Sequence, residues 1–280
     1  MQLINTKKEL KAYLSSQGKT KTIGLVPTMG ALHLGHISLV KKSVEENDLT
    51  LVSIFVNPTQ FNNKEDLEKY PSTLEADITL LKAVTDKIVV FAPTASEIYS
   101  GEVTSNTYDF EGLENVMEGE FRKGHFDGVG TIVEKLLRLI SPTRAYFGEK
   151  DFQQFRIIKK LVEIANLPIE IIGCPIVREA NGLAMSSRNE RLDKELRQEA
   201  AFIYKTLRAA KHKFGTKSAN FVLDWVKKQF NAHPKLKLEY FKIADVDQLK
   251  PVVRKNKKLK YRGFIAVYAA DVRLIDNIAL

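Results

Sequence analysis

The first 175 residues alternate between short apolar runs and longer stretches of helical periodicity, and this alternation constrains the fold more than any other feature. The apolar runs lie at residues 22–27, 49–56, 87–92, 144–148 and 169–173. One helical pattern fills each interval between them, at residues 36–46, 73–84, 129–140 and 152–165. Near-continuous runs of Val, Ile, Leu and Phe are typical of parallel strands that are covered on both faces. The pattern therefore predicts a doubly wound α/β sheet, in which ligands bind at the carboxyl ends of the strands.

The rest of the chain has a different pattern, because the helices come first and the strands follow. Helical periodicity covers residues 193–213 and 218–231. The β-like runs that follow lie at residues 238–244, 263–269 and, more weakly, 273–278. Grouped helices and strands predict a small α+β domain. We therefore expect two domains, residues 1–175 and residues 176–280, with the boundary near residues 174–180.

The net charge of +9 is concentrated in the second of these domains. Residues 1–175 contain 20 basic and 23 acidic side chains, a net charge of −3, whereas residues 176–280 contain 23 and 11, a net charge of +12. Such an excess indicates a polyanionic ligand for the C-terminal part of the chain. Charge alone leaves both nucleic acid and a nucleoside triphosphate open.

Several classes of protein are excluded by composition. The single cysteine, Cys174, rules out an internal disulfide framework and a zinc site built from several cysteines. No stretch of 18 apolar residues exists, so we expect no membrane-spanning helix and no membrane partner. The N-terminal residues lack the apolar core of a secretory signal. The sequence therefore predicts a protein of the cytoplasm.

The segment PTMGALHLGH, residues 27–36, directly follows the first predicted strand and begins the first helix. His33 and His36 are spaced i, i+3, so they share one face of a helix start. Gly30 and Gly35 let the backbone approach a ligand closely. Free N–H groups and the positive dipole end of a helix bind phosphate, and imidazole donors there stabilise charge that develops on a leaving group. Zinc binding by the pair is disfavoured, because no third ligand with suitable spacing is nearby.

Polar residues follow two other predicted strands. Asn57 and Gln60, in the segment NPTQ, offer neutral donors and acceptors to a small substrate, although an ordinary Asn-Pro turn is an alternative interpretation. Lys150 suits a phosphate, and Asp151 suits a helix N-cap or a ribose or metal contact. Gln154 lies one turn further along the same helix face. Three polar groups therefore converge on the end of the fourth predicted strand.

Three further segments each leave two interpretations open. Residues 185–188, Met-Ser-Ser-Arg, form either an anion-binding loop that closes over a triphosphate or a polar turn. Residues 124–130, GHFDGVG, form either a capped helix start near the substrate or a structural turn. The Lys-rich residues 250–262 contain one aromatic side chain and no RNP-like pattern, which favours a solvated loop over a nucleic-acid surface. We expect no nucleic-acid partner.

Taken together and in this order, the motifs PTMGALHLGH, SIFVNPTQF, YPSTLEAD, GHFDGVGTIVEKLL, FGEKDFQQ and GLAMSSRN resemble those of the pantoate–β-alanine ligase family over essentially the whole chain. The resemblance implies a Rossmann-like N-terminal domain that binds ATP and pantoate, and a smaller C-terminal lid domain. It also implies a cytoplasmic homodimer. The HxGH signature is shared with a wider group of adenylyl-transferring enzymes, whose second phosphate loop corresponds to residues 185–188.

The implied reaction is the ATP-dependent condensation of pantoate with β-alanine to pantothenate. Pantoate attacks the α-phosphorus of ATP, pyrophosphate leaves, and β-alanine then attacks the pantoyl adenylate to release AMP. In such a reaction the enzyme mainly positions its reactants and stabilises phosphate charge. ATP and Mg²⁺ are expected together, with the ion held largely by phosphate oxygens and water, so that no direct protein ligand is predicted. Asp77 is a candidate outer-shell ligand.

The resemblance also implies roles for individual residues. His36, His33 and Lys150 are the expected catalytic residues, with His36 as a proton donor. Gln60 and Gln154 are expected to bind pantoate, and Gln60 also to line the β-alanine site. The expected ATP-binding residues are Met29, Gly30, Ala31, Leu32, His33, Leu34, Gly35, His36, Gly148, Glu149, Lys150, Asp151, Val177, Met185, Ser186, Ser187 and Arg188.

Two alternative functions compete with this hypothesis. A nucleotidyltransferase would leave a stable nucleotidylated product, whereas the ligase releases free AMP. An RNA-binding module on the same fold would use residues 250–262 and would bind RNA with a steep salt dependence. The paired glutamines of NPTQF and FGEKDFQQ favour the ligase.

Overall fold

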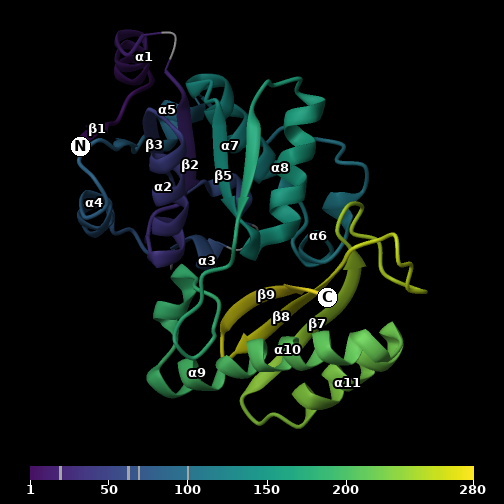
Figure 1. Ribbon diagram of the computed structural model, residues 1–280. Coiled ribbons are helices and arrows are strands. Elements are labelled where there is room, and N and C mark those ends of the chain that lie inside the picture. The colour runs from purple at the N-terminus through teal and green to yellow at the C-terminus, as the bar shows by residue number, and fades with distance from the viewer. Residues whose placement is uncertain (19–20, 62–63, 69, 100) are drawn as a thin grey trace. The chain divides into compact units, whose positions relative to one another are not determined.

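The computed structural model describes residues 1–18, 21–61, 64–68, 70–99 and 101–280 (Figure 1). The chain divides into two compact units. The first, unit 1, consists of Met1–Glu149 and Gln154–Pro175, and the second, unit 2, consists of Lys150–Gln153 and Ile176–Leu280. The short segment Lys150–Gln153 thus groups with residues that follow it by more than twenty positions. Among the described helices, none is long and apolar enough to cross a membrane.

Unit 1 is built on a parallel sheet whose strand order is β1-β4-β3-β2-β5-β6. The strands are β1 (Gln2–Ile4), β2 (Ile23–Thr28), β3 (Leu49–Ile54), β4 (Val89–Phe91), β5 (Arg144–Gly148) and β6 (Glu170–Cys174). The predicted parallel α/β sheet is therefore confirmed. The sequence-based prediction missed β1, because this strand has three residues and two of them are exposed.

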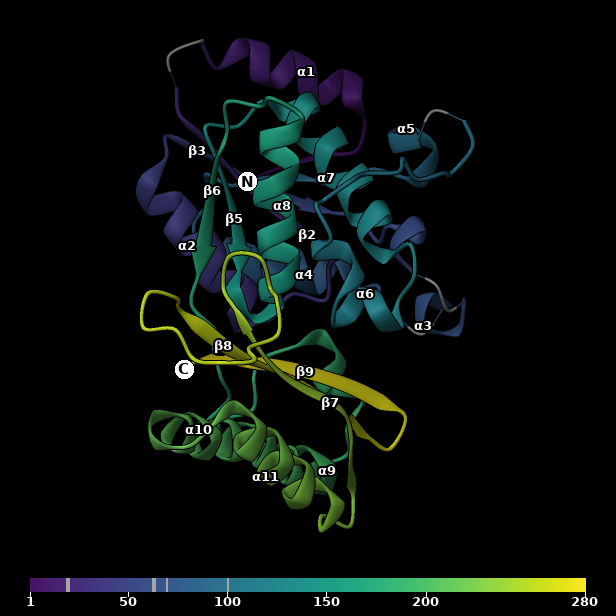
Figure 2. The ribbon, with the colours of Figure 1, turned by 90° about the vertical axis from the view of Figure 1, so that its right-hand side faces the viewer.

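Helices and 3-10 turns connect these strands. They are α1 (Lys7–Ser16), α2 (Leu34–Glu46), η1 (Pro58–Gln60), α3 (Lys64–Glu68), α4 (Leu74–Lys82), α5 (Ala95–Tyr99), η2 (Leu113–Asn115), α6 (Glu118–Phe121), α7 (His125–Ile140), η3 (Glu149–Asp151) and α8 (Phe152–Ile164). Figure 2 shows α2 on one side of the strands and α8 on the other. On the α2 side, Val26, Val52 and Tyr146 pack in one buried cluster with Ile37 and Val40 of α2.

The strand order of unit 1 reverses direction at the boundary between β2 and β5. From β2 the chain adds β3 and β4 on one side, and it then returns to add β5 and β6 on the other side. Open parallel sheets bind ligands outside the carboxyl ends of the strands at such a switch point. Thr28 ends β2 and Gly148 ends β5, so the segments that follow these two residues occupy the expected ligand position.

Unit 2 contains an antiparallel sheet in the order β7-β8-β9, formed by β7 (Leu236–Asp245), β8 (Tyr261–Ala269) and β9 (Val272–Ala279). Its helical elements are η4 (Ser187–Arg191), α9 (Lys194–Glu199), α10 (Ala201–Thr216) and α11 (Ala219–Asn231). The prediction of one helix over residues 193–213 was wrong, because α9 ends at Glu199 and α10 begins at Ala201. The predicted α+β composition of this part of the chain is confirmed.

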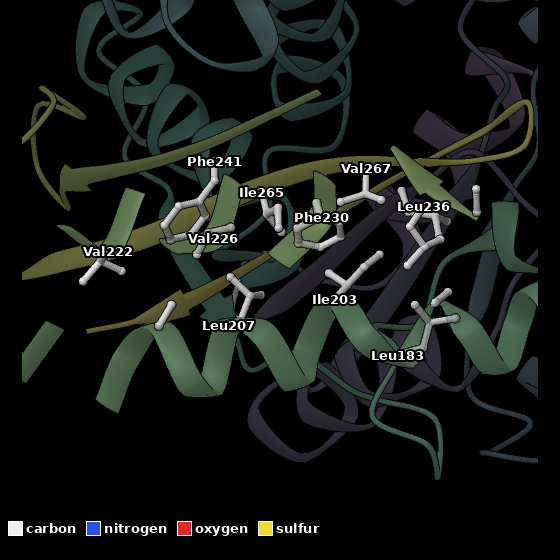
Figure 3. Packing of buried hydrophobic residues seen from close by; sticks show 14 of the residues in the cluster. Leu183, Ile203, Leu207, Val222, Val226, Phe230, Leu236, Phe241, Ile265 and Val267 are labelled. Atoms are coloured by element: carbon white, nitrogen blue, oxygen red, sulfur yellow. The ribbon is translucent and has the colours of Figure 1, made fainter. Parts of the chain in front are cut away.

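The core of unit 2 lies between one face of this sheet and the two long helices (Figure 3). Ile203 and Leu207 of α10, and Val226 of α11, point toward Ile265 and Val267 of β8. Ile265 and Val267 are two positions apart, so they project from the same face of the strand. The other face of β8 carries Phe264 and Ala266.

Candidate functional site

The histidine loop (residues 29–36) leads from the end of β2 into α2 through a sharp turn. Gly30 and Ala31 are both left-handed, with φ of +81° and +48°. This left-handed conformation favours glycine at residue 30, and a Cβ there would also make tight contacts, 3.1 Å from Asp77 Oδ2 and 3.2 Å from Ile54 Cγ2. The turn directs the N-terminus of α2 toward the carboxyl edge of the sheet.

The Asp77 carboxylate holds this turn from α4. Its Oδ2 accepts a hydrogen bond from the Ala31 N–H at 3.0 Å, and its Oδ1 accepts one from the Leu32 N–H at 2.7 Å. The side chain is only 1% exposed, and Thr73 Oγ1 also donates to Oδ1. Bonds from N–H groups to a buried carboxylate are among the stronger hydrogen bonds in proteins. Asp77 therefore positions the backbone of the histidine loop, a role that was not predicted from the sequence, which suggested Asp77 as an outer-shell metal ligand.

The two imidazoles of the histidine loop form a reciprocal cap at the start of α2. His33 Nδ1 accepts from the Gly35 N–H at 3.1 Å, and His36 Nδ1 accepts from the His33 N–H at 3.3 Å. The ring centroids are 4.0 Å apart. A nitrogen that accepts from an N–H carries no proton, so each neutral ring bears its proton on Nε2. The cap therefore fixes the tautomer that gives each ring a donor at Nε2, the atom that a phosphate oxygen requires.

Gln60 is held in place by groups from two neighbouring strand ends. Its side-chain Nε2 contacts the Met29 sulfur after β2, and its Oε1 accepts from Asn57 Nδ2 after β3 at 3.3 Å. Its backbone oxygen lies 2.9 Å from His125 Nδ1, which must therefore carry a proton. The structure thus brings Met29, which follows β2, together with Asn57 and Gln60, which follow β3.

The segment GHFDGVG, residues 124–130, holds Gln60 and its neighbour Asn57 in place through hydrogen bonds from His125 and to Gly128. Gly124, with φ of +75°, precedes α7, and the carbonyl of Gly128 accepts from Asn57 Nδ2 at 3.1 Å. A Cβ at residue 128 would lie 2.3 Å from the Thr59 carbonyl oxygen, so only glycine lets α7 approach η1 this closely. Tyr99 adds a hydrogen bond from its hydroxyl to Asn57 Oδ1. The sequence left a helix start near the substrate and a structural turn open for this segment, and it did not predict this support.

The end of β5 divides its predicted site residues between the two units. Gly148 and Glu149 belong to unit 1, as does Gln154 in the first turn of α8. Lys150 and Asp151 belong to unit 2, and Lys150 Nζ lies 3.1 Å from Asp151 Oδ1. The Lys150 side chain is 19% exposed, whereas that of Asp151 is 44% exposed.

The serine–arginine loop (residues 177–188) of unit 2 is a narrow turn closed by backbone contacts. The Met185 N–H donates to the Val177 carbonyl at 3.0 Å, and Arg178 and Ala184 form an antiparallel bridge. Ser186 caps η4, because its hydroxyl accepts from the Arg188 N–H at 3.3 Å. The structure therefore brings together the predicted residues Val177 and Met185, and Ser186 and Arg188, within this one loop.

The fold and these two loops define a class of protein. An open parallel sheet with a helix N-terminus at its switch point is the arrangement in which α/β enzymes bind nucleotides. Comparison with known proteins places the chain within that class. The family model described as pantoate-beta-alanine ligase matches residues 2–279. The chain therefore belongs to the pantoate–β-alanine ligase family.

Individual relatives agree with this assignment. The chain is 60% identical over 260 residues to the pantothenate synthetase of Christiangramia forsetii, covering 93% of this chain and 92% of the relative. It is 57% identical to that of Flavobacterium psychrophilum, covering 99% and 97%. The predicted family and the predicted class of enzyme, an acid–amine ligase, are thus confirmed.

Solved structures of similar proteins share the fold over the whole chain. A pantothenate synthetase from Thermus thermophilus has a TM-score of 0.91 at 38% identity, covering 99% of both chains. A pantoate-beta-alanine ligase from Francisella tularensis, complexed with beta-gamma ATP and beta-alanine, has a TM-score of 0.83 at 38% identity, covering 100% of this chain and 97% of that one. The predicted combination of a parallel α/β sheet with a small C-terminal α+β part is therefore confirmed.

Proposed function

We propose that the chain joins pantoate to β-alanine in two half-reactions through an enzyme-held pantoyl adenylate. The observation that carries the proposal is the reciprocal histidine cap, which provides two Nε2–H donors beside a helix N-terminus at the switch point. Donors that are fixed in advance stabilise charge as it develops in the transition state. Membership of the ligase family and the ATP-complexed Francisella structure support ATP as the nucleotide.

In the first half-reaction a carboxylate oxygen of pantoate bonds to the α-phosphorus of ATP, and the bond from that phosphorus to the bridging oxygen breaks. Pyrophosphate leaves with the additional negative charge. We assign His33 and His36 to this charge, with His36 as the proton donor. Lys150 and residues 186–188 bind the phosphates as cationic and hydroxyl donors.

In the second half-reaction the amine of β-alanine attacks the acyl carbon. The new C–N bond replaces the C–O bond to AMP, AMP leaves with that oxygen, and the amine loses a proton. Adenylation makes this possible, because a free carboxylate is a poor electrophile whereas an acyl phosphate carries a good leaving group. The β-alanine in the Francisella complex supports this choice of amine.

The remaining site assignments complete this proposal. We assign Gln60 and Gln154 to pantoate, and Gln60 also to β-alanine. The contacts of Gln60 with Met29 and Asn57 support its assignment, because they fix the direction of its amide. The other residues proposed to bind ATP are Met29, Gly30, Ala31, Leu32, Leu34, Gly35, Gly148, Glu149, Asp151, Val177 and Met185.

Mg²⁺ belongs to the same proposal as the ion that accompanies ATP. Within the described part of the chain, no group of three His, Cys, Asp or Glu side chains is arranged to hold a metal ion. Phosphate oxygens and water are ligands that Mg²⁺ accepts readily, and a site of that kind needs no protein cage. The ion would neutralise phosphate charge. We further propose a homodimer in the cytoplasm, with residues 1–175 as the ATP and pantoate domain and residues 176–280 as the lid.

ATP–pyrophosphate exchange tests the proposal most directly. With pantoate present and β-alanine absent, labelled pyrophosphate should enter ATP, and the addition of β-alanine should then release AMP. Exchange that ignores pantoate, or no exchange in folded protein, would overturn the adenylate route, and other carboxylates and CTP would then be screened. A stable nucleotidylated product in place of free AMP would indicate a nucleotidyltransferase.

A further inference from the structure

Two neighbouring polar residues near the end of β9 are both buried. A strand that is covered on one face only would bury every second residue. Asp276 is 4% exposed and Asn277 is 2% exposed. Successive side chains of a strand point to opposite faces of the sheet. Earlier in β9 the pattern alternates, with Val272 and Leu274 buried and Arg273 and Ile275 half-buried. Each of the two polar residues must therefore be covered by a different partner, one on each face.

Asp276 faces Arg178, at the base of the serine–arginine loop. The two form a bidentate ion pair, with Arg178 Nη1 donating to Oδ2 at 2.6 Å and Nη2 donating to Oδ1 at 2.9 Å. The guanidinium also lies 3.6 Å from the centroid of the Tyr204 ring, and its Nη1 donates to the Gly182 carbonyl at 3.1 Å. Gly182 is left-handed, with φ of +96°. Asp276 therefore fixes the guanidinium that fixes the turn of this loop.

Asn277 faces the segment Lys150–Gln153 on the other side of the sheet. Its Nδ2 donates to the Lys150 carbonyl oxygen at 2.7 Å, and its Oδ1 accepts from Arg262 Nη1. The Arg262 guanidinium lies 4.0 Å from the centroid of the Phe152 ring, which also packs near Phe264. These contacts explain why Lys150–Gln153 groups with unit 2.

We propose that Asp276 and Asn277 are positioning residues that hold Lys150 and the serine–arginine loop as one phosphate-binding assembly. The inference rests on the proposed function, in which Lys150 and residues 186–188 bind the phosphates of ATP. The groups of a triphosphate lie close together, and a misplacement of about 1 Å can reduce a rate by roughly 10². One strand that anchors both segments keeps their donors in register with one another.

The decisive experiment is a double-mutant cycle between Asn277 and Lys150 in the ATP–pyrophosphate exchange assay. Asn277→Asp removes the donor to the Lys150 carbonyl but keeps the acceptor for Arg262. It should lower kcat/KM for ATP by about tenfold, the range for one buried hydrogen bond, and leave the KM for pantoate within about twofold. In the Lys150→Ala background the same change should cost less than about twofold, because residues that act through one another are not additive.

Each other result has a definite reading. A tenfold loss from Asn277→Asp that persists in the Lys150→Ala background would show that Asn277 does not act through Lys150, and would overturn the proposal. So would an unchanged kcat/KM in the single variant. Wild-type protein without pantoate-dependent exchange would instead refute the proposed function. If exchange is normal in wild type and unaffected by Lys150→Ala, the adenylate route is retained. Lys150 then does not bind the phosphates, and the present proposal is overturned.

A matched control separates positioning from general support of the sheet. Glu239 of β7 accepts from Arg273 of β9 at 2.9 and 2.5 Å, and this partly buried ion pair lies on the same sheet. Glu239→Gln should change the melting temperature without changing the KM for ATP. Asn277→Ala should match Asn277→Asp in the KM for ATP if the lost donor is responsible, whereas a defect confined to Asn277→Ala would assign the effect to Arg262 and contradict the proposal.

Asp276→Asn tests the other face of the strand. It keeps the shape of the side chain and removes the charge that pairs with Arg178. We expect the KM for ATP to rise about tenfold, since the hydrogen bonds of a charged pair are stronger than neutral ones, with the KM for pantoate within about twofold. An equal rise in both KM values, together with a lower melting temperature, would show a merely structural role for Asp276.

Discussion

The two proposed phosphate loops are fixed by different chemistry. In unit 1 a buried carboxylate, Asp77, binds the backbone N–H groups of Ala31 and Leu32 directly. In unit 2 a backbone carbonyl, that of Gly182, is held by the Arg178 guanidinium, and a buried carboxylate holds the guanidinium in turn. The histidine loop is thus clamped in one step. The serine–arginine loop is closed by its own backbone hydrogen bonds, and its turn at Gly182 is held in addition through a relay.

The difference indicates how much movement each loop tolerates. Removing the carboxylate from a direct clamp takes the acceptor from the buried Leu32 N–H and the partly buried Ala31 N–H. A buried group left unsatisfied costs about 1–3 kcal/mol. A relay passes through a long side chain, whose rotamers can absorb a small displacement before the backbone moves. We therefore expect catalysis to depend more steeply on the histidine loop than on the serine–arginine loop.

His36→Ala should have the largest effect. The substitution removes one oriented donor and also the acceptor that caps the His33 N–H, so the rate of adenylation should fall by about 10²–10³. Pantoate-dependent pyrophosphate exchange, measured at saturating ATP, reports this rate. Activity within a few-fold of wild type would contradict the assigned role.

Asp77→Asn should cause the second-largest loss in the rate of adenylation. The amide cannot accept from both N–H groups, so the turn loosens and adenylation should fall by about 10–10², the range for a small misplacement of reacting groups. Thr73→Val is the matched control, because it removes only the third hydrogen bond to Asp77, and it should stay within about threefold. Equal effects of the two substitutions would show that the clamp on the backbone is not the feature that matters.

Much of this fold could be predicted from the sequence, because the signals are local. Near-continuous apolar runs indicated β2 to β6, and strand-end motifs placed His33, Gln60 and Lys150 at the edge of the sheet. The failures were also local: β1 is too short to show a period, and the helical pattern at 193–213 runs through Ala200 without a visible break.

The anchors of the site could not be predicted, because their partners are far away in the chain. Asp77 binds a backbone 46 positions earlier, and Asn277 binds a carbonyl 127 positions earlier. The residue type does not predict such a contact. An aspartate in the first turn of a helix, for example, is common there without any tertiary partner. Only tertiary packing shows which buried polar group satisfies which backbone atom.

Glycines in the two units should respond in opposite ways to a single methyl group. Gly128→Ala would place a Cβ 2.3 Å from the Thr59 carbonyl, so it should destabilise the protein by about 1–3 kcal/mol and raise the KM for pantoate several-fold by displacing Gln60. Gly215 in α10 has open space around its missing Cβ, so Gly215→Ala should stabilise by about 0.5–1 kcal/mol with unchanged kinetics. Urea unfolding and steady-state kinetics of both variants test the pair, and a neutral Gly128→Ala would mean that α7 does not set the position of Gln60.

The smallest expected effect is the alkaline sensitivity of unit 1. Burial, together with a hydrogen bond to Glu134, raises the pKa of Tyr108 to about 12. Burial, together with a hydrogen bond to the Glu46 carboxylate, likewise raises the pKa of Tyr146 to about 12. A folded-state pKa above the ordinary value of 10 favours the neutral phenol in the folded protein. The resulting stability is therefore fully present below pH 10 and is lost as the pH rises through 12. Both tyrosines belong to unit 1.

Urea unfolding at pH 9 and pH 11 should show this loss, at most about 1 kcal/mol per tyrosine. The double variant Tyr108→Phe and Tyr146→Phe cannot lose a phenolic proton, so its stability should fall less than that of wild type over the same interval. Trp225, in α11, reports on unit 2 and should show the same pH dependence in both proteins. If wild type and the double variant fall equally by every probe, the alkaline loss does not come from these phenols, and the contrast between the units would then rest on the loops alone.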